Sequence, residues 1–269
     1  PVNGPRDRAP VTVAFTHAWV HVAPGEQLRD ATVLIEGDRI VAVGRNVRVP
    51  AQAQVIDLKG AHLWPGFIDP YSAAGMPGER PERPRTTPGY WNRAVRADVD
   101  AAITWNAGSD AAKALRRQGY TPLLVHDMDG IVRGTGAAVS LGERSASEDL
   151  LLHRSAAHFS FRKGSSPDRY PSSLMGTIAL LRQAIIDARW HAAGGDARHA
   201  DVQLEALAAQ LQGPLVFEAD GRDNLLRAAR IATEFDLRFI LKGSGDEYLR
   251  LADVLAIGSP LIIPMALPA

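Results

Sequence analysis

The sequence contains no cysteine among its 269 residues. Disulfide bonds, thiolate nucleophiles and zinc sites built from cysteine are therefore excluded. The sequence also lacks an excess of either charge, since 30 lysine and arginine residues balance 30 aspartate and glutamate residues. A domain that binds nucleic acid usually carries a basic surplus, so no nucleic-acid partner is expected.

No apolar run approaches the ~20 residues that a membrane-spanning helix needs, so no membrane span is expected. Residues 1–10 contain proline, glycine and charged side chains, which predict an extended arm without a signal-peptide pattern. Because Pro1 stands where an initiator methionine would, we interpret the chain as a fragment or a processed subunit. The apolar content of 46% is typical of a folded globular protein.

Short segments with alternating apolar side chains fill the first quarter of the chain and predict a small β unit. Turn residues such as Pro24-Gly25 and Gly37-Asp38 separate these segments. Strands at such close spacing suggest a β-sandwich, and we place the two domains at 1–63 and 64–269. The expected strands cover residues 11–15, 17–22, 31–36, 39–44, 55–58 and 62–63.

The second region opens with the turn Pro65-Gly66, followed by the apolar pair Phe67-Ile68 and then Asp69. This pattern predicts a short buried strand that stops at an acid. Barrels of α/β type place their active sites at the carboxyl ends of the strands. Asp69 is therefore a candidate pocket residue.

From residue 214 onward, continuous apolar strands alternate with helices, which predicts a parallel sheet covered by helices. Glu218 and Lys242 end two of these strands and are expected on the same rim as Asp69. Earlier in the chain, residues 131–141 predict a hairpin or a bent strand. The other expected strands cover 120–127, 150–161, 214–219, 237–243 and 260–264, and the expected helices cover 109–118, 174–191, 201–211, 223–235 and 247–256.

Proline and glycine interrupt residues 73–100 and predict a long loop. Tyr90, Trp91 and Trp105 give this region aromatic side chains. We expect them to fasten the loop onto the mouth of a barrel. The alternative is an aromatic surface at 90–105 that grips a ligand or a partner.

Two further residues are candidates for a pocket. His126 follows an apolar strand beside Asp127, where it could line a pocket or make a structural hydrogen bond. Arg133, beside Gly134, could bind a substrate carboxylate. His153 and His158 are expected to be structural. The complete candidate pocket consists of Asp69, Tyr71, His126, Arg133, Glu218 and Lys242.

Several stretches resemble the amidohydrolase superfamily. Residues 65–69 match the start of its signature, Pro-Gly-Phe/Leu-Ile-Asp-x-His-x-His, and TVLIEGDRIVAVG with VIDLKGAHLWPGFID resembles its N-terminal β-sandwich. RGTGAAVSL, AAHFSFRKGSS and YPSSLMGTIALLRQAIIDARW resemble the degenerate first half of large tandem bacterial exported proteins related to imidazolonepropionase. The resemblance implies an α/β fold, with a small N-terminal β-sandwich and a TIM-like (β/α) barrel, and a periplasmic or secreted location.

The chain departs from the family at its metal ligands. The two signature histidines are replaced by Tyr71 and Ala73, and two later strand-end histidines by Glu218 and Lys242. An active member uses a divalent ion, usually zinc, to activate a water molecule. The resulting hydroxide attacks the carbonyl carbon of the substrate, and the C–N bond is hydrolysed. We therefore expect no metal in this chain and identify no catalytic residue in it. Glu218 and Lys242 are expected to pair with each other. A zinc or other divalent ion is expected in the other, active half of the protein.

About five barrel strands are expected, whereas a closed barrel of this type has eight. We therefore expect an incomplete barrel, completed by the remainder of the polypeptide or by a second amidohydrolase-like chain. The assembly would hydrolyse an amide, cyclic amide or peptide-like substrate, with this chain as a scaffold. The alternatives are a metal-free or altered-site hydrolase in its own right, and a binding module that uses the loop 90–105.

Overall fold

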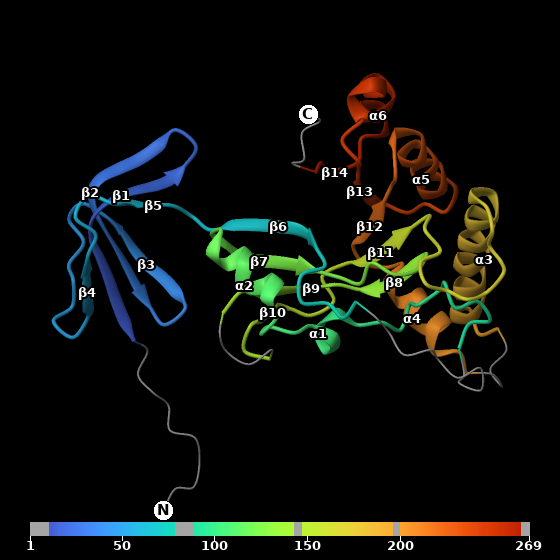
Figure 1. Cartoon of the computed structure of the whole chain (residues 1–269), viewed down its shortest axis with the longest axis horizontal. Coiled ribbons are helices and arrows are strands. Elements are labelled where there is room, and N and C mark those ends of the chain that lie inside the picture. Colours follow the sequence, from blue (N-terminus) through green and yellow to red (C-terminus); the bar gives the residue numbers. More distant parts are fainter. Residues whose placement is uncertain (1–10, 79–88, 143–146, 196–199, 265–269) are drawn as a thin grey trace, which may run out of the picture. The chain divides into compact units, whose positions relative to one another are not determined.

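The computed structural model describes residues 11–78, 89–142, 147–195 and 200–264 (Figure 1). The chain divides into two compact units, Pro1–Gly66 and Phe67–Ala269. The arm expected at residues 1–10 lies outside the described residues. None of the helices in the described part of the chain is long and apolar enough to cross a membrane.

The first unit is a connected five-stranded sheet with the order β3-β2-β1-β4, in which β5 also pairs with β1. Two strands were expected between residues 11 and 22, but the structure has one. The chain continues through a bulge between Phe15 and Ala18, where His17 has a φ of 53°. The strands are β1 (Thr12–Ala23), β2 (Glu26–Glu36), β3 (Arg39–Gly44), β4 (Gln54–Asp57) and β5 (His62–Leu63).

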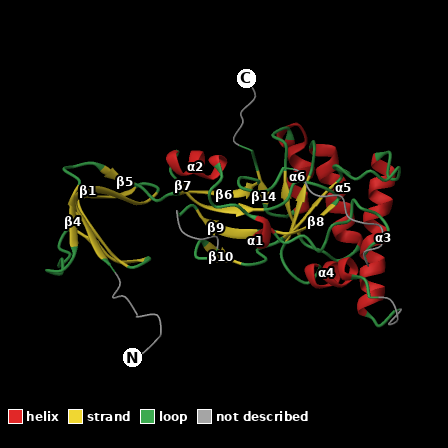
Figure 2. Cartoon of the chain, turned by 60° about the horizontal axis from the view of Figure 1, so that its bottom comes forward, coloured by secondary structure: helices red, strands yellow, loops and turns green. Residues whose placement is uncertain are grey.

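The second unit contains two sheets, which Figure 2 shows flanked by helices. In the larger sheet, β11 to β14 run parallel to one another and β8 is antiparallel to β11. The described strands do not close into a barrel, so the expectation of an α/β fold with an incomplete barrel is confirmed. The smaller sheet has the order β10-β9-β7-β6, with β6 (Phe67–Ser72), β7 (Tyr120–Val125), β9 (Ala137–Ser140) and β10 (Leu150–Leu152); the larger has the order β14-β13-β12-β11-β8, with β8 (Val132–Thr135), β11 (Ala157–Ser160), β12 (Leu215–Glu218), β13 (Phe239–Lys242) and β14 (Leu261–Ile262).

The segment 131–141 is a bent strand rather than a hairpin. Its first part, β8, pairs with β11, whereas its second part, β9, pairs with β7 and β10. The bend lies at Gly136, where a Cβ atom would stand 2.8 Å from the carbonyl oxygen of Val125. The expected strand at 150–161 is likewise divided, because β10 and β11 belong to different sheets.

The helices begin at the residues that local sequence chemistry predicts. The side chains of Ser109, Ser173 and Asp201 each accept a hydrogen bond from a backbone amide of the first turn. On α3, Ile185 packs in the core, whereas the next residue, Ile186, is exposed. The helices are α1 (Ala101–Thr104), α2 (Asp110–Arg117), α3 (Leu174–Ala192), α4 (Val202–Gln210), α5 (Arg222–Glu234), the 3₁₀ helix η1 (Glu247–Arg250) and α6 (Leu251–Ile257).

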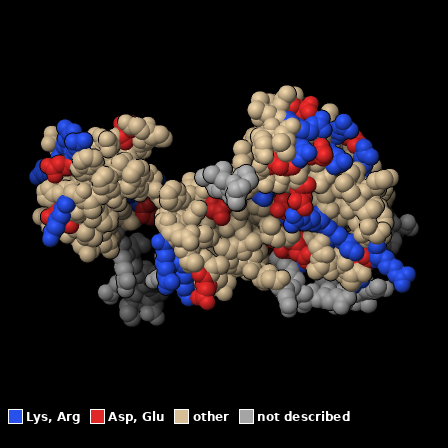
Figure 3. Space-filling model, turned by 45° about the horizontal axis from the view of Figure 1, so that its top comes forward, with Lys and Arg blue, Asp and Glu red and all other residues tan. Residues whose placement is uncertain are grey.

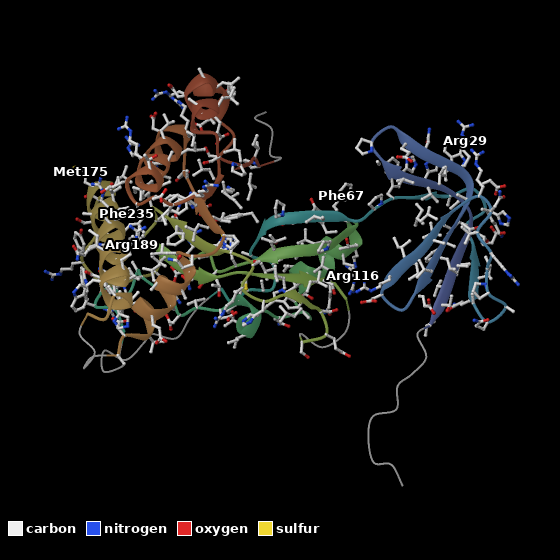
Figure 4. All side chains as sticks on the ribbon, turned by 180° about the vertical axis from the view of Figure 1, so that it is seen from behind. Arg29, Phe67, Arg116, Met175, Arg189 and Phe235 are labelled. Carbon is white, nitrogen blue, oxygen red and sulfur yellow. The ribbon has the colours of Figure 1, made fainter. Side chains whose placement is uncertain are left out.

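Basic and acidic side chains are interspersed over the face of the second unit that Figure 3 shows. Arg222 and Asp246 approach to 2.8 Å, and Arg250 and Asp253 to 2.7 Å. Arg189 donates a hydrogen bond to the carbonyl of Phe235, and its guanidinium lies 5.5 Å from that ring (Figure 4). Basic side chains on this surface thus lie beside acidic ones and form ion pairs with them.

The expected buried strand that ends at Asp69 differs from the structure in two ways. Strand β6 continues to Ser72, and Phe67 and Ile68 are each 62% exposed. Figure 4 shows Phe67 on β6, the end strand of its sheet. In the described part of the chain nothing pairs with its outer edge.

The aromatic residues of the long loop are mostly inside the protein. Tyr90 and Trp105 are buried, and the Trp105 indole donates a hydrogen bond to the carbonyl of Ala74 at 3.1 Å. Trp91 is exposed and stacks beside Tyr170. Two of the three rings therefore fasten the loop to its surroundings rather than forming a surface.

Candidate functional site

Glu218 and Lys242 lie next to each other because they occupy the same register position. They are the last residues of the parallel strands β12 and β13, and their Cα atoms are direct partners. The Lys242 Nζ atom lies 3.9 Å from Glu218 Oε1. The two side chains thus form the ion pair that the sequence suggested, at the carboxyl ends of both strands.

Arg133 is the closer partner of Glu218. It extends from β8, is 1% exposed, and donates through Nη1 to Glu218 Oε2 at 2.7 Å and to the Tyr71 hydroxyl at 3.0 Å. Its Nε donates to the carbonyl of Gly130 at 3.1 Å, which fixes the side chain. The sequence suggested that Arg133 could bind a substrate carboxylate. In the structure its guanidinium binds the carboxylate of Glu218 in the same chain.

The charge state of the cluster follows from opposing effects on Glu218 and Tyr71. Burial alone would raise the pKa of Glu218, but the positive charges of Arg133 and Lys242 outweigh it, so its pKa is lowered. Burial raises the pKa of the Tyr71 hydroxyl, although Arg133 opposes that rise. At neutral pH the cluster therefore contains a carboxylate and a neutral phenol.

Beside Tyr71, two histidine rings stack inside the protein. The centroids of His126 and His158 are 3.9 Å apart with 9° between the planes, and the Tyr71 ring lies 4.1 Å from that of His126. His126 Nδ1 donates to the carbonyl of Asp127 at 2.8 Å. Its Nε2 atom and Nδ1 of His158 are buried, and no atom in the described part of the chain forms a hydrogen bond with either of them.

Both histidines are neutral at pH 7. Burial lowers the pKa of His126 to about 4. The pKa of His158 is well below 6.5 because of burial and because of the neighbouring His126 and Arg133. His158 was expected to be structural and was not included in the candidate pocket. In the sequence His158 stands between the apolar residues Ala157 and Phe159, a signal that could have indicated a buried position. In the structure every residue of β11 is buried.

Asp69 stands apart from these contacts. Its Oδ1 accepts a hydrogen bond from the backbone amide of Tyr71 at 3.0 Å, which is a local turn interaction. Its charge acts on His126, where it slightly opposes the lowering of the pKa. The structure thus joins five of the six candidate residues in one connected cluster and leaves Asp69 at its edge.

The residues present do not fit a divalent metal centre. Arg133 and Lys242 neutralise Glu218, and their positive charges oppose a further cation. A metal lies in the plane of each imidazole that binds it, and the nearly parallel planes of His126 and His158 are stacked, so they share no such position. Across residues 11–78, 89–142, 147–195 and 200–264, no three or more histidine, aspartate or glutamate side chains are arranged to hold a metal.

The chain resembles known proteins in sequence. It is 30% identical over 172 residues to the imidazolonepropionase of Streptomyces griseus subsp. griseus, covering 60% of this chain and 42% of that protein. It is 36% identical over 104 residues to the imidazolonepropionase of Streptomyces coelicolor, covering 35% of this chain and 26% of that protein. The chain thus spans less than half the length of these relatives. No family model matches it.

The fold is also found in a solved structure. The crystal structure of an amidohydrolase from Thermotoga maritima matches with a TM-score of 0.77 and 23% identity, covering 94% of this chain and 70% of that one. With a sequence identity of 23%, the match shows that the two chains share a fold and no more than that. Together these matches show that the chain is similar in sequence to imidazolonepropionases and shares the fold of an amidohydrolase.

Proposed function

We propose that this chain is the scaffold part of an amidohydrolase-type protein that hydrolyses a C–N bond, and that its strand-end cluster is structural. The observation that supports this is the position of Arg133 between Tyr71 and Glu218. A guanidinium is held where the family resemblance would lead one to expect metal ligands. The positive charge of Arg133 stabilises the buried carboxylate of Glu218, so this position holds an ion pair in place of a catalytic metal ion.

The ionisation of the cluster supports the same role. A general base must be accessible to the reacting molecule and must accept a proton near the working pH. Glu218 has a lowered pKa and is bound by Arg133, while Tyr71 holds its proton firmly. His126 is fully buried. Each of these three groups is thus poorly suited to activate water.

We propose that further strands cover the outer edges of β6 and β14 in the second unit. Strands β6 and β14 are both end strands, and unpaired strand edges favour pairing with another segment. Phe67 and Ile68 on β6 are exposed, as are Leu255 and Ile263 around β14. The covering segments would be apolar strands from the same polypeptide or from a second amidohydrolase-like chain. The domain division at residue 63 is part of this proposal.

The substrate would be an amide, a cyclic amide or a peptide-like molecule, and a zinc or other divalent ion would belong to the completing segment. The periplasmic or secreted location expected from the resemblance is a further prediction, which fractionation of the source cells would test.

The test uses the purified chain of residues 1–269. We expect its metal content, measured by mass spectrometry after incubation with zinc and removal of the excess, to stay well below one equivalent. We also expect no hydrolysis of hydantoin or of a dipeptide. Turnover that disappears in Lys242→Met, while circular dichroism shows that the variant is folded, would support the alternative, in which the rim itself is a metal-free hydrolase. Stoichiometric zinc would refute the scaffold proposal.

A further inference from the structure

A cavity of about 210 Å³ lies at the other end of the strands from the candidate site. Ala157, the first residue of β11, and Pro214, which precedes β12, both line it. Glu218 ends β12, so the length of a strand, about 10 Å, separates the cavity from the charged cluster. The two sites are therefore distinct.

Small apolar side chains create the space. Ala206 and Ala209 of α4 form one wall, Ala156 and Val99 contribute to others, and α4 packs beside β8 (Figure 1). A water molecule occupies about 30 Å³, so the volume exceeds what one water fills. It is smaller than the pockets of about 300–1,000 Å³ that hold drug-sized ligands. The size suits a molecule with only a few heavy atoms.

The polar groups of the cavity divide into two kinds. Arg154 supplies a guanidinium, whose Nε lies 3.6 Å from Asp100 Oδ2. Asp98 supplies a carboxylate, positioned by the hydrogen bond that it accepts from Gln203 Nε2 at 3.0 Å. A ligand with both an anionic and a cationic group would match this arrangement.

Gln210 adds an unsatisfied acceptor. Its Nε2 donates to the carbonyl of Ala97 at 2.5 Å, while its Oε1 is buried without a hydrogen-bond partner among the described residues. Buried polar atoms in folded proteins nearly always have a partner, in the protein or in a bound molecule. A donor supplied by a ligand would satisfy this oxygen.

We propose that this cavity binds a small zwitterion, an α-amino acid with a short aliphatic side chain. The ligand carboxylate pairs with Arg154, because guanidinium and carboxylate form strong charge-assisted hydrogen bonds. The ligand ammonium lies between Asp98 and Gln210, and its aliphatic side chain packs against Ala206 and Ala209. The proposal does not depend on the scaffold role of the chain.

The first test compares three ligands of similar shape by isothermal titration calorimetry with the purified chain. L-Valine carries both charges, isobutylamine only the positive one and isobutyrate only the negative one. We expect saturable one-to-one binding of L-valine, with each single-charge analogue at least about tenfold weaker. Absence of binding by L-valine, or equal binding of all three, would overturn the proposal.

Two variants then locate the binding site. Arg154→Gln changes an exposed side chain, so the fold is retained, and we expect it to weaken L-valine binding about tenfold. Ala206→Phe fills the cavity and should abolish binding, with circular dichroism verifying that the chain is folded. Arg227→Gln on α5, outside the cavity, serves as the control and should bind L-valine as the parent does. Unchanged affinity in folded Arg154→Gln would refute the assignment.

Discussion

Arg133 and Glu218 are 85 residues apart in the sequence, yet Arg133 Nη1 lies 2.7 Å from Glu218 Oε2 with both side chains buried. Because each charge has lost its contact with water, each depends on the other. The pair joins β8 to β12, which are separated in the sheet by β11.

Replacing Glu218 by glutamine should strongly destabilise the protein. The change leaves the Arg133 charge buried without its carboxylate, and removing one partner of a buried pair typically costs about 3–5 kcal/mol. Urea unfolding followed by circular dichroism measures the free energy. As a control, Asp253→Asn disrupts the exposed pair with Arg250 and should cost less than about 1 kcal/mol. Equal losses would contradict the structural role of the buried pair.

Replacing Lys242 by methionine should have a smaller effect than replacing Arg133 by methionine. Lys242 lies 3.9 Å from Glu218 and is one-fifth exposed, whereas Arg133 is closer and fully buried. We expect a cost of less than about 1 kcal/mol for Lys242→Met. The same unfolding experiment ranks the two variants, and the reverse order would identify Lys242 as the main partner of Glu218.

Stability should fall as the pH decreases from 6.5 towards 4. His126 has a folded-state pKa of about 4 against an ordinary value of 6.5, so in this range the unfolded chain binds a proton that the folded chain does not. The full difference corresponds to about 3 kcal/mol at pH values above 6.5. Glu218, with its lowered pKa, contributes stability above pH 4.5 that is lost at lower pH.

Free energies of unfolding measured in urea between pH 7 and pH 4 test this dependence. His126→Phe should make the profile less steep, since it removes one of the two buried histidines whose pKa is lowered. A profile as steep in His126→Phe as in the parent would assign the effect to other groups.

Gly134 should not tolerate alanine. Its φ is 77°, and a Cβ atom would stand 2.0 Å from the carbonyl oxygen of Val99. Backbone strain and overpacking each typically cost about 1–3 kcal/mol, so we expect a loss of several kcal/mol in thermal or urea unfolding. Gly78→Ala is the control, because a Cβ atom there meets nothing within 4 Å. A fully stable Gly134→Ala would contradict the close approach of Val99 to β8.

Lysine should be tolerated at Phe67 and Ile68 in the isolated chain. Both side chains are exposed on the outer strand β6, and surface substitutions usually change stability by within about 0.5 kcal/mol. We expect less self-association in size-exclusion chromatography with light scattering. Phe239→Lys on β13 should instead prevent folding, since Phe239 is buried. Loss of folding in the β6 variants would show that the edge is covered within this chain.

Local chemistry accounts for the features that the sequence predicted well. Ser173 begins α3 because its hydroxyl accepts the amide of Gly176, an interaction within three residues. The alternation of strands and helices after residue 214 placed Glu218 and Lys242 at neighbouring strand ends, since parallel strands share one direction. In both cases the determining contacts lie close together in the sequence or follow from strand periodicity.

Other features depend on contacts that sequence patterns do not encode. The pairing of Arg133 with Glu218 requires β8 to join the same sheet as β12, which the pattern of residues 131–141 left open. The stacking of His158 on His126 likewise joins β11 to the end of β7. The exposure of Phe67 could not be inferred, because an apolar side chain looks the same in a central strand and in an end strand.

The turn at Gly136 makes one piece of backbone a member of both sheets. Neither sheet can slide or detach without pulling on the residues that belong to the other. The amide protons of Val132 and Val139 should consequently exchange with solvent in a single concerted opening, with closely similar protection, although Val132 lies in β8 of the larger sheet and Val139 in β9 of the smaller one.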